Sequence, residues 1–237
     1  MELEDRVAVV TGGSTGIGRA TARELAREGA RVAICARTEP DLEEAAREIR
    51  SEGGEVVAVT ADVSSREDVE RLASRAREEL GPVDVLVNNA GIGVFGSLEE
   101  LRAEDFDRCF DVNVRGVFLC CRAFAPSMAE RGDGVVVNVA SLAGKNFFPG
   151  GSVYAGSKHA VMGLSKSLMV ELRDRGVRVL TVCPGSVDTP FFDKADREQP
   201  DREKIVAPED VAELIVESVR LSDRGTVSEV EIRPVNP

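Results

Sequence analysis

The feature that most constrains the fold is a regular alternation of short β-branched runs with segments of helical spacing. Seven such runs can be read along the chain, at positions 7–10, 32–35, 56–59, 83–87, 135–139, 177–183 and 227–232. Between them apolar residues recur at helical intervals, for example Leu42, Ala45, Ala46 and Ile49 at i, i+3, i+4 and i+7. The alternation predicts repeated βα units, which build a sheet of parallel strands joined by right-handed crossovers.

The apolar content of the runs indicates how the strands are covered. The first six are apolar nearly throughout, as expected for parallel strands with helices on both faces, whereas the last alternates like an edge strand. We therefore predict an α/β fold, a single doubly wound Rossmann-type domain over residues 1–237 with a seven-stranded, mainly parallel sheet. Segment 186–207 is rich in charge and poor in apolar residues, which predicts a mobile substrate lid.

Charge and composition limit the kinds of partner that this chain can bind. The formal net charge of −12 argues against nucleic acid and anionic membranes, because both require clustered Lys and Arg. The sequence shows no apolar leader and no run long enough to span a bilayer, so we expect a cytoplasmic protein. The five cysteines lack metal-ligand spacing and His159 is the only histidine, so we expect no metal site.

A glycine-rich turn, Thr11-Gly-Gly-Ser-Thr-Gly-Ile-Gly18, follows the first run directly. In such a turn Gly12 permits a sharp bend, Gly16 lets the backbone approach a pyrophosphate, and Gly18 allows the next helix to pack closely. The N-terminus of that helix favours an anion. The turn, which also includes Ser14, Thr15 and Ile17, is therefore predicted to bind the phosphates of a dinucleotide.

Tyr154 and Lys158 are four residues apart, so on a helix both side chains project from one face. A phenol ordinarily titrates near pKa ~10, and a neighbouring ammonium lowers that pKa toward the neutral range. Tyr154 is therefore a candidate proton donor or acceptor, and it is the only tyrosine in the chain. Ser141 follows the fifth run, where its hydroxyl can stabilise charge on a substrate oxygen or, alternatively, cap a helix.

The spacing Gly-x-x-x-Gly-x-Gly resembles that of the short-chain dehydrogenase/reductase family, and further motifs follow in the family's order. These are Asn88-Asn-Ala-Gly91 after the fourth run, Asn113, Ser141, Tyr154 with Lys158, and Pro184-Gly185 after the sixth run. The resemblance covers nearly the whole chain. It implies an enzyme in which Asn113, Ser141, Tyr154 and Lys158 are catalytic, with Asn113 holding a water in line with Lys158; alone, Asn113 could equally bend a helix.

The resemblance also implies cofactor contacts beyond the glycine turn. Asp62 would bond the adenine amino group, although it could instead cap a helix; Asn89, Ala90 and Gly91 would lie along the adenosine ribose; Thr189 would hold the carboxamide. The remaining residues implied in cofactor binding are Val63, Tyr154, Lys158, Pro184, Gly185 and Val187.

The second run ends in Ala36, where a site for NAD would carry a carboxylate that bonds the ribose 2′-hydroxyl. Arg37 follows, and a guanidinium can meet a 2′-phosphate through two parallel hydrogen bonds. We therefore predict NADP(H) as cofactor, the alternative being that Arg37 is an ordinary surface arginine.

The predicted reaction is hydride transfer between NADP(H) and a small-molecule carbonyl or secondary alcohol. The substrate region by analogy comprises Val94, Phe95, residues 142–149, Phe191 and Phe192, which favours a hydrophobic substrate. One alternative is a 3-oxoacyl-carrier-protein reductase, because Arg131 and Arg175 match arginines that contact the acidic carrier in such enzymes. A second is a non-catalytic NADP-binding sensor on the same fold.

Family members commonly pair through the two long helices beside the site, here about 105–131 and 153–173. We therefore expect a homotetramer or homodimer. The C-terminal sequence 229–237 lacks the Asp-Gly-Gly ending often seen in the family, which leaves the second dimer axis open.

Overall fold

The computed structural model describes residues 1–191, 201–202, 204–222 and 224–235. Its strands are β1 (Val7–Thr11), β2 (Arg31–Ala36), β3 (Val56–Thr60), β4 (Val85–Asn88), β5 (Gly134–Val139), β6 (Val177–Pro184) and β7 (Glu229–Ile232). They form one sheet in the order β3-β2-β1-β4-β5-β6-β7, and every neighbouring pair of these strands is parallel. The predicted seven-stranded α/β sheet is therefore confirmed, with β7 at one edge.

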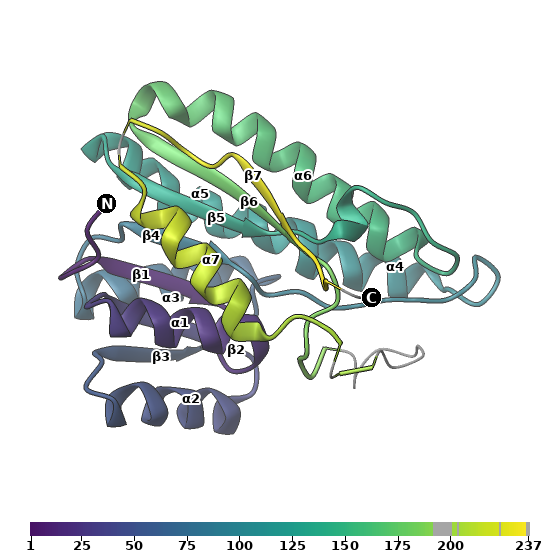
Figure 1. Ribbon diagram of the computed structural model, residues 1–237, viewed down its shortest axis with the longest axis horizontal. Coiled ribbons are helices and arrows are strands. Elements are labelled where there is room, and N and C mark those ends of the chain that lie inside the picture. The colour runs from purple at the N-terminus through teal and green to yellow at the C-terminus, as the bar shows by residue number, and fades with distance from the viewer. Residues whose placement is uncertain (192–200, 203, 223, 236–237) are drawn as a thin grey trace.

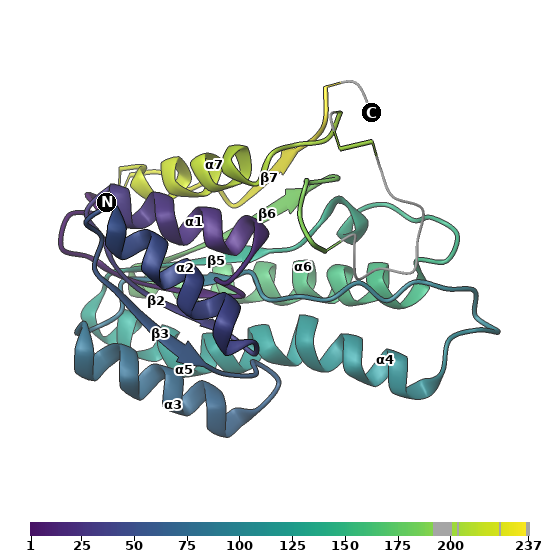
Figure 2. The same ribbon diagram turned by 90° about the horizontal axis from the view of Figure 1, so that it is seen from below.

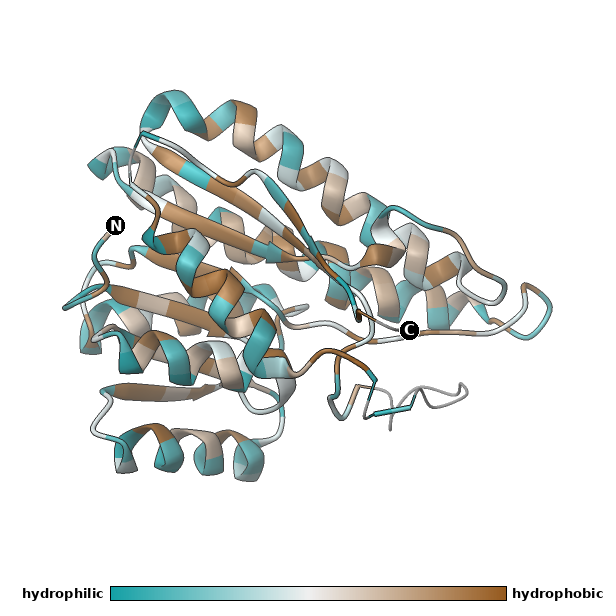
Figure 3. Cartoon of the chain, in the orientation of Figure 1, coloured by the Kyte–Doolittle hydropathy of each residue, from teal (hydrophilic) through white to brown (hydrophobic). Residues whose placement is uncertain are grey.

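Helices cover both faces of this sheet (Figures 1 and 2). The helices α1 (Gly16–Arg27), α2 (Glu39–Ser51) and α7 (Pro208–Arg220) pack on one face, whereas α3 (Arg66–Glu79), α5 (Gly116–Arg131) and α6 (Ser152–Leu172) pack on the other. Figure 3 shows strands that are hydrophobic over most of their length between helices of mixed hydropathy. Each helix thus buries one apolar stripe against the sheet.

Local sequence signals account for several helix ends. Thr38 precedes α2, which has Pro40 in its first turn together with the acidic residues Glu39 and Asp41, as the helix dipole favours. Ser65 caps α3 by accepting a hydrogen bond from the backbone N–H of Asp68 at 3.2 Å. Gly132 ends α5 in the left-handed conformation, with φ of 71°.

The long helix expected at about 105–131 is divided. It consists of α4 (Ala103–Phe110), a π-helical turn over Asp111–Arg115 and then α5. Two short 3₁₀ helices, η2 (Leu142–Gly144) and η3 (Arg173–Arg175), flank α6. The π turn lies where Asn113 is buried, so the interruption positions a predicted site residue.

Two strands begin two residues later than predicted, β4 at Val85 and β7 at Glu229, and the other strand ends differ from the predicted ones by at most one residue. Residues 192–200 and 203 of the predicted lid, Phe192 among them, lie outside the described residues. The described ends of this segment are joined by a parallel bridge between Val187 and Val206, both buried. In the part of the chain that the structure describes, no helix combines the length and apolarity that crossing a membrane demands.

Ion pairs join α1 to α2 along their exposed sides. The basic partners on α1 are spaced by four residues, as are the acidic partners on α2 and at its C-cap Glu52, so that one helical face meets the other. The pairs are Arg19–Glu44 at 3.2 Å, Arg19–Glu48 at 2.7 Å, Arg23–Glu48 at 3.6 Å, Arg23–Glu52 and Arg27–Glu52 at 3.1 Å.

Candidate active site

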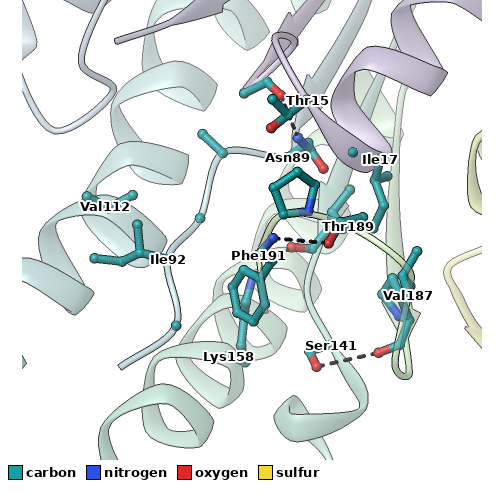
Figure 4. Close-up of a pocket in the computed structure, with 18 of the residues that line it drawn as sticks. Thr15, Ile17, Asn89, Ile92, Val112, Ser141, Lys158, Val187, Thr189 and Phe191 are labelled. Carbon is teal, nitrogen blue, oxygen red and sulfur yellow. Dashed lines mark hydrogen bonds between the residues drawn. The ribbon is translucent and has the colours of Figure 1, made fainter. Parts of the chain in front are cut away.

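A cavity of about 740 Å³ opens at the carboxyl ends of the strands (Figure 4). It spans the point where the sheet order reverses between β1 and β4, which is where ligands bind in doubly wound sheets. The catalytic and cofactor-binding residues predicted from the sequence all line it except Gly18 and Asn113. The predicted set is therefore brought together in one place.

The glycine turn needs its glycines for two separate reasons. Gly12 and Gly16 have positive φ angles of 66° and 54°, a conformation that disfavours residues with a Cβ. A Cβ on Gly18 would lie 2.1 Å from the carbonyl oxygen of Gly12, so this glycine lets α1 start directly against the turn. Ser14, Thr15 and Gly16 then face the cavity at the N-terminus of α1.

Thr11, which the sequence reading passed over, joins this turn to the segment after β4. Its hydroxyl accepts hydrogen bonds from the backbone N–H groups of Asn89 at 3.0 Å and Ala90 at 3.1 Å. The amide of Asn89 in turn donates to the carbonyl oxygens of Thr11 at 3.0 Å and Gly12 at 3.2 Å. These four bonds fix the two backbone segments that border the cavity near the N-terminus of α1.

Asn113 holds the continuation of the same segment. Its Oδ1 accepts from the backbone N–H of Ile92 at 2.8 Å, and its Nδ2 donates to the Ile92 carbonyl oxygen at 3.0 Å and to Ser157 Oγ at 3.0 Å. Ser157, also missed by the sequence reading, donates to the carbonyl oxygen of Tyr154 at 2.7 Å. The side chain of Asn113 therefore ties the strand-end segment to the first turn of α6.

Lys158 and Tyr154 both line the cavity, one turn apart on α6. Lys158 is only 5 % exposed, its Nζ donates to the carbonyl oxygen of Val139 at 3.0 Å, and that nitrogen lies 5.9 Å from the centroid of the Tyr154 ring. Burial lowers the pKa of Lys158 from 10.5 to about 8. At neutral pH the ammonium form still predominates beside the phenol.

Ser141 stands between β5 and η2, close to the end of β6. Its hydroxyl donates to the carbonyl oxygen of Pro184 at 3.4 Å and accepts from the backbone N–H of Ala143 at 3.1 Å. The serine thus caps η2, which was its alternative interpretation, and it lines the cavity as well. Capping fixes the position of the hydroxyl that faces the cavity.

Aromatic rings surround Tyr154. The ring centroid of Phe95 lies 5.1 Å from that of Tyr154, and Phe191 lies at 5.7 Å. Phe148 contacts the same cluster, 6.1 Å from Phe95. Val94, expected in the substrate region, instead packs in a separate buried cluster and does not line the cavity. The wall near Tyr154 is therefore largely apolar.

The opposite end of the cavity carries Arg37, Asp41 and Asp62. Arg37 is exposed, and among the described residues it has no ion-pair partner within 4.0 Å. Asp62 Oδ1 accepts from the backbone N–H and the hydroxyl of Ser64 at 2.9 and 2.6 Å. The capping role considered for Asp62 belongs to Ser65 instead.

The remaining sequence candidates lie away from the reacting centre. Arg131 donates to the carbonyl oxygen of Val83 and lies 3.4 Å from Asp84, at the amino end of β4. His159 Nδ1 lies 2.9 Å from the Ala155 carbonyl oxygen, and its ring stacks on Phe147. The five cysteines are buried and free, and no metal-binding cluster occurs within the described residues.

A glycine turn at the first strand, a buried lysine beside a tyrosine and an adjacent serine define a dinucleotide-dependent oxidoreductase of the Rossmann type. The sequence model for short chain dehydrogenases matches residues 6–200, and the chain belongs to that family. It is an oxidoreductase of this family, as the resemblance predicted.

Relatives and solved structures agree with this assignment. An uncharacterised oxidoreductase of Staphylococcus saprophyticus is 36 % identical over 236 residues, covering 99 % of this chain and 100 % of the relative. The alcohol dehydrogenase of Thermococcus sibiricus, solved with 5-hydroxy-NADP, superimposes with a TM-score of 0.89 at 37 % identity, covering 97 % of each chain. A metagenomic short-chain oxidoreductase in complex with NADP has a TM-score of 0.87 at 37 % identity over 100 % of each chain.

Proposed function

We propose that this protein transfers a hydride between NADP(H) and a carbonyl compound or secondary alcohol, with Tyr154 as proton donor or acceptor. The observation that carries the proposal is the convergence of Ser141, Tyr154 and Lys158 on the cavity that also contains the glycine turn. In the proposed reaction Ser141 binds the substrate oxygen, Tyr154 exchanges a proton with that oxygen, and Lys158 supports the exchange.

The cavity fits a dinucleotide on two grounds. Gly12 and Gly16 line the cavity with backbone alone, and a Cβ on either would meet Asn89 or Thr189 at 2.9 or 2.8 Å. The N-terminus of α1, which favours a phosphate, lies at the same turn. Asn89, Ala90 and Gly91 would border the adenosine ribose, Asp62 the adenine, and Pro184, Gly185, Val187 and Thr189 the nicotinamide end. When bound, the cofactor supplies or accepts the hydride.

In the proposed mechanism the chain's own groups control one proton. Ser141 Oγ would turn its one proton from the Pro184 carbonyl oxygen to the substrate oxygen. The Tyr154 hydroxyl gives that oxygen its proton during reduction or takes it during oxidation. The ammonium of Lys158 favours the phenolate by its charge. Asn113 holds the Ile92 backbone in place beside the lysine, where a water could connect Lys158 to solvent.

NADP(H) rather than NAD(H) is favoured by Arg37. No carboxylate stands at position 36, and the exposed guanidinium has no partner of its own within the described residues. Two solved structures similar to this chain contain NADP or a derivative of it. A 2′-phosphate would therefore meet an available cation.

A spectrophotometric screen tests the proposal: the purified protein should consume NADPH with ketones, aldehydes or quinones of apolar character. Tyr154→Phe should retain cofactor affinity and lower turnover by a factor of about 100 or more. Near wild-type turnover of Tyr154→Phe on a substrate that the wild type reduces would show that the mechanism is wrong. The apolar surroundings of Tyr154 favour such substrates over carrier-bound thioesters, and Arg131 is occupied by Val83 and Asp84.

Assembly into a homodimer or homotetramer is a separate part of the proposal. Large apolar side chains are exposed on the helices expected at the interface: Phe106 on α4 (46 %), Phe118 on α5 (47 %) and Val170 on α6 (57 %). A second copy packing on this surface would bury them. Light scattering that showed only monomer at micromolar concentration would exclude the assembly.

A further inference from the structure

The charged side chains that line the cavity are unevenly distributed. Its only carboxylates, within the described chain, are Asp41 and Asp62, which lie with Arg37 at the proposed adenosine end. Lys158, Arg108 and Arg233 complete the charged lining. In a chain of net charge −12, the end that holds Tyr154 and Ser141 is therefore bordered by cations without a lining carboxylate.

Arg233 reaches this border because of the register of β7. Side chains alternate along a strand, so Glu229, Glu231 and Arg233 lie on one face, whereas Val230 and Ile232 lie on the other. Val230 and Ile232 pack in the core cluster that contains α7. The three charged residues therefore point to the opposite side, toward α6 and the loop after Ser141.

An ion-pair cluster holds these side chains. Lys145, four residues after Ser141, binds both Glu229 and Glu231, and Lys166 on α6 lies 3.3 Å from Glu229. Arg233 donates from Nε at 3.0 Å and Nη2 at 2.6 Å to the same oxygen of Glu231. With three cations and two carboxylates, the cluster keeps a net positive charge. Glu231 fixes the Nε edge of the Arg233 guanidinium, whereas none of the described residues accepts a hydrogen bond from Nη1.

The cluster also lies close to the reacting centre. The backbone N–H of Gly185 donates to the carbonyl oxygen of Ile232 at 2.8 Å, and Arg233 follows directly. Pro184, the residue before Gly185, accepts the hydrogen bond from Ser141 at 3.4 Å. Arg233 is thus joined to the serine of the proposed reaction through two adjacent backbone segments.

We propose that Arg233 is a specificity-determining residue that binds a carboxylate carried by the substrate at the end remote from its carbonyl group. The aromatic wall of Phe95, Phe148 and Phe191 would hold the apolar body of such a substrate. The Arg233 side chain is 54 % exposed, and its guanidinium, which Glu231 holds by one edge, offers its remaining donors to the carboxylate. This inference rests on the proposed carbonyl reduction and narrows its substrate class.

The test compares two ketones that differ in charge, 4-acetylbenzoate and 4-acetylbenzamide, with NADPH. The wild type should have the higher kcat/KM for the carboxylate. Arg233→Gln should lower that value at least about 10-fold and change the value for the amide less than about twofold, and Arg233→Lys should fall between. Arg77→Gln, on the exposed side of α3, is the matched control for charge loss. Raising the salt concentration should weaken only the preference for the anion.

A binding measurement separates this inference from the proposed reaction. A ketone cannot be reduced by oxidised cofactor, so calorimetric titration of the NADP⁺ complex with each ketone reads affinity without turnover. Tighter binding of 4-acetylbenzoate by the wild type, lost in Arg233→Gln, supports the inference even if neither ketone is reduced, a result that would count against the proposed function alone. Equal affinity for the two ketones, no binding of the anion, or an equal loss of both in Arg233→Gln overturns it.

Discussion

Asn113 and Ile92 are joined by two hydrogen bonds: the Asn113 side chain accepts from the Ile92 backbone N–H at 2.8 Å and donates to the Ile92 carbonyl oxygen at 3.0 Å. The pairing resembles that between neighbouring strands, with a side chain in place of one backbone. It extends the ordering of the chain beyond the end of β4 and across the centre of the cavity.

Replacing Asn113 by Leu should therefore weaken both stability and cofactor binding. The substitution leaves the part-buried Ile92 backbone groups without these partners and removes the donor to Ser157 Oγ, which should lower the free energy of unfolding by about 1 to 3 kcal/mol. Chemical denaturation and the Kd for NADPH measure the two effects. Asn113→Asp, which keeps the acceptor and loses the donor, should lie between wild type and Leu; unchanged values in both variants would contradict the role of the pairing.

Lys158 should make stability depend on pH in a defined window. Its pKa is lowered by burial from 10.5 to about 8, so between these values the unfolded chain binds more protons than the folded one. Stability from this residue should rise with pH across the window, because below it the cost of the buried charge is fully present. Relative to Lys158→Met, the wild type without cofactor should gain on the order of 1 to 3 kcal/mol in urea denaturation. Parallel curves for the two proteins would be inconsistent with the lowered pKa.

Arg37 should decide between the two nicotinamide cofactors. Ala36→Asp combined with Arg37→Ala removes a charge-assisted pair and adds repulsion of the 2′-phosphate, each on the order of 1 to 3 kcal/mol. The ratio of kcat/KM for NADPH to that for NADH should therefore fall by at least about 10-fold. Arg47→Ala, an exposed arginine on α2 that does not line the cavity, controls for loss of charge. Equal or better efficiency of the wild type with NADH would show that Arg37 is only a surface residue.

Gly18 should be intolerant of the smallest side chain. An alanine Cβ would meet the Gly12 carbonyl oxygen and the Asn89 amide, so α1 would have to move away from the turn. We expect Gly18→Ala to lower the midpoint of thermal unfolding and to weaken NADPH binding. Gly225→Ala meets nothing within 4 Å and should change stability by less than about 0.5 kcal/mol. Similar behaviour of the two variants would argue against close packing at Gly18.

The sequence alone predicted the strands and most of the cavity lining, because each depends on local signals. Apolar runs mark buried parallel strands, and the glycine turn and the Tyr154–Lys158 spacing specify geometry within a few residues. Apolar residues do not mark where a strand begins, and for this reason the predicted fourth strand started two residues early, at 83 instead of Val85.

What the sequence could not supply depends on contacts between distant segments. The π turn around Asn113 is linked to its partner Ile92, 21 residues earlier, and helical periodicity does not report such a partner. Thr11 is read only as the first residue of the glycine turn, and its role appears when the segment after β4 is seen to donate to its hydroxyl. Arg233 appears as one of many arginines, since its place at the cavity follows only from the register between β6 and β7.

Because of the arginine–glutamate ion pairs between α1 and α2, the two ends of the cavity are stabilised by different kinds of interaction. Beside the proposed adenosine end, α2 is held to α1 partly by half-exposed charged side chains, whose attraction is screened by ions in solution. Around Tyr154 the walls are packed rings and buried hydrogen bonds, which ions scarcely affect. Added salt should therefore weaken binding of the adenosine half of the cofactor, whereas the residues around Tyr154 should keep their arrangement.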